Sequence, residues 1–330
     1  ANSCLWTVSF SRFAGNSTCS GQGVVLQLVM GHALAHKDEF WVNVRNAIGR
    51  EEASKLIPMT YFLKDPRDVE LLKAEIDKFP DRKYILKGFE HRQQSITICS
   101  SAEVFTADPD ALMAQVLMED TIRVSGRALS IRVYMMIKRH PSGSLSVHVY
   151  HDGKVYYAPA PAGGNGTAIQ ELVATSYASR AVYDTNPMTL LLLLDRLKSL
   201  GHNNTADLLP VLAKKLLGVV RSQRKLASVP ERSAHHIYTE LFAADMILTS
   251  KLEPYILEVN RSPDLDFKDA TDTAFKVPMA RAYLCHSTVL PNRDCIVPCP
   301  NSTDANKACR AEDGFVLLGT IPPPARPRSA

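Results

Sequence analysis

The stretch "AADMILTSKLEPYILEVN" (243–260) constrains the fold more than any other part of the chain. Two apolar segments flank a short polar turn, which predicts two adjacent antiparallel strands. If the turn is centred between Lys251 and Leu252, Asp245 and Glu258 stand opposite each other, about 5 Å apart on one sheet face. Asn260, two residues beyond Glu258, shares that face. Three converging oxygen-bearing side chains are typical of a site for a hard cation such as magnesium. The alternative is a solvated polar sheet face.

The rest of the sequence mixes strands and helices without regular strand–helix–strand repeats. The pattern predicts a helix over 65–80, with an Asp-Pro start and a Pro stop, and a long strand over 127–139. It favours a helix over 108–120, and over 145–159 a hairpin with Asp-Gly at its tip. We therefore expect an α+β protein with mixed sheets flanked by helices.

We divide the chain into a lead-in, a core and a tail. The lead-in contains a cysteine pair, and the tail is rich in cysteine with a proline-rich end. The predicted bounds are 1–23 for the lead-in, 24–270 for the core (about 24–80, 81–140 and 141–270) and 271–330 for the tail.

Cysteines and glycosylation sequons favour an oxidising, extracellular or luminal compartment. The start "ANSCLW" indicates a mature end left by signal-peptide cleavage, although a trimmed chain would look the same. Zinc is the rival for the tail cysteines, but C-x2-C knuckles are absent from the sequence. The predicted disulfide cysteines are Cys4, Cys19, Cys285, Cys295, Cys299 and Cys309, with Cys99 free and buried. The predicted N-glycosylation sites are Asn16, Asn165, Asn203 and Asn301. Asn260 also opens a sequon, but Pro263 and the strand context predict that it carries no glycan.

Charge and hydropathy exclude two classes of partner. The net charge of +4 comes without a dense Lys/Arg stripe, which argues against nucleic acid. The longest apolar run, residues 190–194, is far too short to span a bilayer.

Several motifs together resemble the tubulin–tyrosine ligase-like family, which has the ATP-grasp fold. The family's closing pattern is matched by "TELFAADMILTSKLEPYILEVNRSPDL", and its "G-R-K-x-D-I-R-V-Y" appears as "GRALSIRVY" (126–134). Its earlier "P-x-T-Y" and "W-I-x-K" appear as "IPMTYFL" and "KYILKGF". The similarity covers roughly residues 40–270 in the family's order.

The resemblance implies ATP-dependent ligation, in which a carboxylate is activated as an acyl phosphate and an amine attacks it. Asp245, Glu258 and Asn260 would then hold magnesium, and Lys87 would contact the ATP phosphates. Arg132 would bind phosphate or the acyl phosphate, and an equally good reading of Arg132 is a cross-sheet salt bridge. Ser95 is the other candidate nucleotide-binding residue.

The sequence also departs from the family near the nucleotide. The loop "HRQQSI" after Lys87 lacks the family's glycines, which let backbone amides approach phosphates. Ala128 and Ser130 replace a Lys and an Asp. Combined with the sequons, this predicts a secreted glycoprotein that keeps the scaffold but has lost catalysis. Its expected role is binding or structural, through self-association, a filament or contact with another extracellular protein. The alternative is an active, ATP- and Mg²⁺-dependent carboxylate–amine ligase.

Overall fold

A computed structural model describes most of the chain. The described residues are 24–25, 28, 31–88, 96–164, 166–174, 180–223, 226, 237–261, 263–287, 296–298, 308–310 and 314–323.

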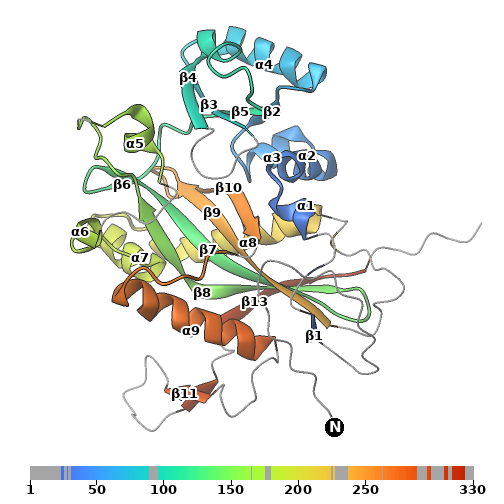
Figure 1. The fold of residues 1–330 in the computed structure, drawn as a ribbon, viewed down its shortest axis with the longest axis vertical. Helices are drawn as coiled ribbons and strands as arrows, with labels where there is room; N and C mark the ends of the chain where they lie inside the picture. The colour runs from blue at the N-terminus through green and yellow to red at the C-terminus, as the bar shows by residue number, and fades with distance from the viewer. Residues whose placement is uncertain are drawn as a thin grey trace, which may run out of the picture.

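A large sheet forms the centre of the molecule (Figure 1). Its main strands, in spatial order, are β1 (Val24–Val25), β9 (Ile237–Leu248), β7 (Arg127–Arg139), β8 (Leu145–Tyr157) and β13 (Phe315–Ile321). Strand β10 (Pro254–Arg261) also pairs with β9, and β6 (Arg123–Val124) pairs with β7. The pairing is antiparallel except between β1 and β9. Long antiparallel strands can carry different side chains on their two faces, which is how this sheet packs helices on both sides.

A smaller antiparallel sheet lies beside the N-terminal helices (Figure 1). Its spatial order is β2 (Thr60–Phe62), β5 (Met113–Val116), β3 (Lys83–Lys87) and β4 (Ile96–Ser100), the last followed by the short helix η1 (Ser101–Glu103). Helix α4 (Pro66–Lys78) packs on this sheet through Leu72. Asp65 caps α4 by accepting a hydrogen bond from the Arg67 amide, so the predicted helix over 65–80 is confirmed.

The two faces of the large sheet pack against two different hydrophobic cores. On β7, Ile131 and Val133 face helix α8 (Thr205–Ser222), while Tyr134 and Met136 face helix α9 (Ala270–His286). The remaining helices are α1 (His32–Ala35), α2 (Lys37–Ile48), α3 (Arg50–Ser54), α5 (Ala168–Leu172), α6 (Arg180–Tyr183) and α7 (Leu190–Ser199). A separate pair, β11 (Ile296–Pro298) with β12 (Ala308–Arg310), lies near the C-terminus. The predicted α+β class, with mixed sheets flanked by helices, is confirmed.

Two local predictions are wrong. Residues 108–120 do not form a helix, because Met113–Val116 is the strand β5, inserted between β2 and β3. Residues 145–157 form one strand rather than a hairpin. The Asp-Gly pair instead lies at an irregularity of β8, where the Asp152 carboxylate accepts hydrogen bonds from the amides of Gly153 and Leu191.

Two elements of the predicted tail pack against the large sheet. Helix α9 contributes Phe275 and Met279 to the core on its face, and β13 pairs along the edge of β8. Helix α9 also carries Asp272, whose buried carboxylate is ion-paired with both Lys154 and Lys276. Of the helices in the described ranges, none combines the length and apolar character that a bilayer crossing needs.

Candidate active site

Arg132, Asp245 and Glu258 form a row across three neighbouring strands of the large sheet. Arg132 on β7 pairs in register with Asp245 on β9, and Asp245 pairs with Glu258 on β10. The hairpin pairs Leu248 with Pro254 near its turn, and the register shifts by one residue between Ile256 and Glu258. This bulge brings Glu258, rather than its neighbour, opposite Asp245.

The side chains of this row are joined by hydrogen bonds. Arg132 donates to both carboxylate oxygens of Asp245, from Nε and Nη2, each at 2.7 Å. The Asn260 amide donates to Asp245 Oδ2 at 3.0 Å and to Glu258 Oε1 at 3.2 Å. The Arg132 guanidinium also lies 5.0 Å from the ring centre of Tyr156. The predicted convergence of Asp245, Glu258 and Asn260 is therefore present, and Arg132 makes the cross-sheet salt bridge that the sequence left open.

Burial dominates the electrostatics of Asp245. Its side chain is almost fully buried, and desolvation raises its pKa to about 6, although the Arg132 hydrogen bonds act in the opposite direction. Glu258 adds a further upward contribution as a neighbouring like charge. Burial lowers the pKa of Arg132, but its bond to Asp245 outweighs this and the net pKa is raised. At neutral pH Asp245 is therefore ionised and Arg132 is protonated, so the two side chains form an ion pair.

A cavity of about 190 Å³ lies between the two sheets, with Asp245 and Glu258 of this row at one wall. Its polar lining includes Lys87, Gln115, Ser130, Asp245 and Glu258, and its apolar lining includes Ile85, Leu117, Met118, Ile247 and Leu257. A mainly apolar cleft with a few convergent polar groups is the usual form of a small-molecule site. The apolar walls suit a planar base, and the polar end suits phosphates.

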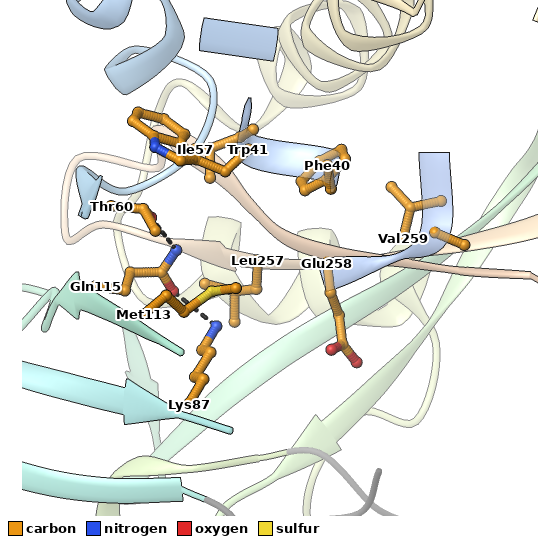
Figure 2. A pocket seen from close by; sticks show the side chains of 11 residues that line it. Phe40, Trp41, Ile57, Thr60, Lys87, Met113, Gln115, Leu257, Glu258 and Val259 are labelled. Carbon is orange, nitrogen blue, oxygen red and sulfur yellow. Dashed lines mark hydrogen bonds between the residues drawn. The ribbon is translucent and has the colours of Figure 1, made fainter. Parts of the chain in front are cut away.

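Lys87 reaches this region from the small sheet. Its ammonium group donates a hydrogen bond to Gln115 Oε1 at 2.8 Å, and Gln115 Nε2 donates to Thr60 Oγ1 at 2.8 Å (Figure 2). Lys87, Gln115 and Glu258 also line a smaller recess that Thr60 shares. The structure thus places Lys87, Asp245 and Glu258 on the walls of one cavity. Gln115 was missed because its segment has a helix-like apolar pattern.

The positions where the sequence departs from the family pattern also lie on this cavity. Ala128 and Ser130 line it, and the Ser130 hydroxyl donates a hydrogen bond to the carbonyl of Ala174. Ser95 and residues 91–94 of its loop fall outside the described residues.

The side chains of the row fit a magnesium ion. Magnesium is usually held by one or two carboxylates together with substrate phosphates and water, and Asp245 and Glu258 supply two carboxylates at the polar end of the cavity. Asn260 adds an amide that already bridges both of them. Within the described ranges there is no cluster of three or more His, Cys, Asp or Glu suited to a metal, so an all-protein cage is not present there.

Comparison with known proteins agrees with this geometry. The model of the tubulin-tyrosine ligase family matches residues 184–296, which include β9 and β10. A tubulin polyglutamylase ttll-4 of Caenorhabditis briggsae is 26% identical over 266 residues, covering 76% of this chain and 44% of the relative. A tubulin monoglutamylase TTLL4 of Homo sapiens is 24% identical over 295 residues, covering 83% of this chain and 24% of the relative. The chain thus spans less than half the length of these relatives.

Fold, site and relatives together define an ATP-grasp-like chain. The chain is similar to the tubulin-tyrosine ligase family, whose model matches residues 184–296, and to relatives that are 24–26% identical to it.

The prediction of a secreted, extracellular or luminal glycoprotein without catalysis is wrong, as is that of a filament-forming structural role. The relatives are named as tubulin-modifying enzymes, and none points to a secreted scaffold. The error came from giving weight to short sequons, which recur by chance, and to missing glycines, while the carboxylate row and the cavity persist.

The individual cysteine and sequon residues give little further information. Cys99 is a buried free thiol, and Cys285 on α9 is disulfide-bonded. Asn203 is exposed in the turn before α8. The described side chains do not include Cys4, Cys19, Cys295, Cys299, Cys309, Asn16, Asn165 or Asn301.

Proposed function

We propose that this chain is an ATP- and Mg²⁺-dependent carboxylate–amine ligase that adds an amino acid to a protein side chain or chain end. The observation that carries the proposal is the in-register row of Arg132, Asp245 and Glu258, whose two carboxylates line a cavity that Lys87 also lines. Phosphoryl transfer requires positive groups and a metal ion around the transferred phosphate, and the polar end of this cavity could hold both.

The net reaction consumes one ATP for each amide bond formed. The acceptor carboxylate takes the γ-phosphoryl group and ADP leaves. The amine of the second substrate then attacks the carbonyl carbon and loses a proton, and phosphate departs. Bound magnesium would supply charge neutralisation for the phosphates. Asp245, Glu258 and Asn260 would hold that ion.

Lys87 and Arg132 have separate roles in this proposal. Lys87 lies on the small sheet, across the cavity from the carboxylates, and provides a point charge for phosphate. Arg132 presents a planar guanidinium that suits a carboxylate or phosphate, and in this structure Asp245 occupies it.

The names of the relatives suggest the substrates. Because they are called tubulin polyglutamylases and monoglutamylases, we propose glutamate as the added amino acid and tubulin as the first acceptor to test. Both belong to the proposal, since the chain covers only 44% and 24% of those two relatives.

A direct test measures ADP release and incorporation of radiolabelled glutamate into tubulin, with tyrosine as the competing amino acid. We expect both signals to require Mg²⁺. Glu258→Gln and Asp245→Asn should each reduce incorporation by at least about a hundredfold, the scale seen when one charge-stabilising group is removed.

Glu253→Gln is the matched control, because Glu253 is an exposed carboxylate of the same hairpin outside the row. It should keep the wild-type rate. Equal incorporation by wild type and Glu258→Gln would contradict the proposal, as would ADP release that does not depend on Mg²⁺.

A further inference from the structure

A chain of polar side chains crosses the small sheet from its outer strand to the cavity. Thr60 on β2 pairs in register with Gln115 on β5, and Gln115 pairs with Ile85 on β3. Lys87 is two residues beyond Ile85, so its side chain lies on the same face as Gln115. The side chains of Thr60, Gln115 and Lys87 are thereby brought into one line (Figure 2).

The hydrogen bonds along this line have a fixed direction. The Thr60 hydroxyl donates to the carbonyl of Pro58 at 2.8 Å, so at Gln115 it acts as an acceptor. At the other end the Lys87 ammonium can only donate, so Gln115 must present its carbonyl oxygen there. The carbonyl of Pro58 is a second acceptor for the Gln115 amide, but at 3.5 Å it is at the limit of hydrogen bonding.

Thr60 itself is held firmly. Its backbone carbonyl accepts a hydrogen bond from Arg50 at 3.1 Å, and Arg50 is ion-paired with the buried carboxylate of Asp68. Asp68 also accepts from the amide of Phe62, on the same strand, at 2.8 Å, and from Arg45 on α2 at 2.7 Å. Strand β2 is thus bonded to residues of helices α2, α3 and α4, and these contacts restrain the position of Thr60.

Thr60 lies behind the site rather than in it. It is 1% exposed and does not line the cavity of about 190 Å³, whereas Gln115 and Lys87 do. The Thr60 hydroxyl is connected to that cavity through Gln115, whose amide donates to it, and through the carbonyl of Pro58, which accepts from it.

We propose that Thr60 is a positioning residue, which fixes the orientation of the Gln115 amide so that its oxygen holds the Lys87 ammonium at the cavity wall. This inference rests on the proposed function for the identity of the ligand, a nucleotide phosphate, but not for the positioning itself. A lysine has a long flexible stem, so holding its end in place before the ligand arrives reduces the entropy lost on binding.

Three variants separate the hydroxyl from the side-chain volume. Thr60→Val removes the hydroxyl and keeps the shape, and Thr60→Ser restores it. Thr239→Val is the matched control, because Thr239 is equally buried but lies on β9 near the far end of the large sheet.

Two readouts are measured on the full chain. The first is the affinity for a fluorescent ATP analogue with Mg²⁺. The second is the acylation rate of Lys87 by an amine-reactive ester, read by peptide mass spectrometry relative to the exposed Lys83 of the same strand. Thr60→Val should weaken binding and raise the relative acylation of Lys87, each by about fivefold, the effect of one lost hydrogen bond. Thr60→Ser and Thr239→Val should match wild type.

The two hypotheses fail in different ways. If the analogue binds no form of the protein, the proposed function is overturned, and the acylation ratio alone decides the role of Thr60. If Thr60→Val gives the wild-type acylation ratio, or if Thr60→Ser behaves like Thr60→Val, the positioning role is overturned.

Discussion

Arg132 holds both carboxylate oxygens of Asp245, each at 2.7 Å, so the residue best placed to bind a metal is already bound by an arginine. A cation and Arg132 must therefore compete for Asp245 unless the side chains rearrange. We therefore expect the site to have a low affinity for a free metal ion and a higher affinity for a metal ion bound to nucleotide phosphates.

We predict that Arg132→Gln binds Mn²⁺ more tightly than wild type in the absence of nucleotide, by about tenfold, since removing the guanidinium frees the carboxylate. Mn²⁺ binding is measured by electron paramagnetic resonance at pH 7.5. Arg127→Gln serves as control, because Arg127 donates to the carbonyls of Ala158 and Pro159 and makes no contact with the row. Weaker Mn²⁺ binding by Arg132→Gln would show that the arginine supports the metal site.

The raised pKa of Asp245 predicts a pH-dependent stability. The pKa is about 6 in the folded chain and about 3.9 when unfolded, so between these values the folded state binds more protons. Its contribution to the free energy of unfolding is therefore greatest below pH 4 and falls as the pH rises to 6, by up to about 3 kcal/mol.

Urea denaturation in the presence of a chelator tests this prediction. From pH 4 to pH 6 the unfolding free energy of wild type should fall relative to that of Asp245→Asn. Above pH 7 the difference between the two should stay constant. A difference that is flat across this range would show that Asp245 titrates normally.

The buried ion triad of α9 predicts a large loss of stability. Asp272 is 0% exposed and is paired with Lys154 and Lys276. Asp272→Asn leaves two buried ammonium groups without their carboxylate, which should cost about 3–5 kcal/mol. The measurement is urea denaturation at pH 7, with the half-exposed Asp264→Asn expected to change stability by less than about 1 kcal/mol.

Gly153 packs against the strand that carries Arg132. A Cβ at this position would lie 2.9 Å from the backbone carbonyl of Arg132. Gly153→Ala should therefore destabilise the chain by about 1–3 kcal/mol. Gly218→Ala is the opposite control, because Gly218 is inside α8 and its new methyl would make ordinary contact with Leu56, so a gain of about 0.5–1 kcal/mol is expected. Thermal unfolding of both variants gives the comparison.

The carboxylate pair could be predicted from sequence because strand pairing near a tight turn is nearly symmetric. The agreement nevertheless depends on a bulge that the sequence did not show. The pair nearest the turn, Leu248 with Pro254, is centred on Lys251, and without the register shift Asp245 would stand opposite Leu257. The prediction placed the centre half a residue later and so anticipated the shifted pairing.

Other features depend on contacts between distant segments. Met113–Val116 reads as part of a helix, but the strand is set by pairing with β2 and β3, which lie more than twenty residues earlier. Asp152 accepts a hydrogen bond from the amide of Leu191 at the start of α7, and it does not form a turn. Asp272 on α9 is likewise paired with Lys154 on β8, which lies 118 residues earlier in the chain. None of these contacts leaves a local signal.

The register of the three strands has a consequence for how such a chain can change over generations. An insertion or deletion of one residue within β7, β9 or β10 would turn Arg132, Asp245 or Glu258 to the opposite side of the sheet. Substitutions elsewhere on these strands leave that geometry intact. The chain shares 24–26% of the aligned residues with its relatives, so most aligned positions differ. The register argument predicts that these differences leave the lengths of β7, β9 and β10 unchanged, and that insertions and deletions fall in connecting segments such as the helical stretch between β8 and β9.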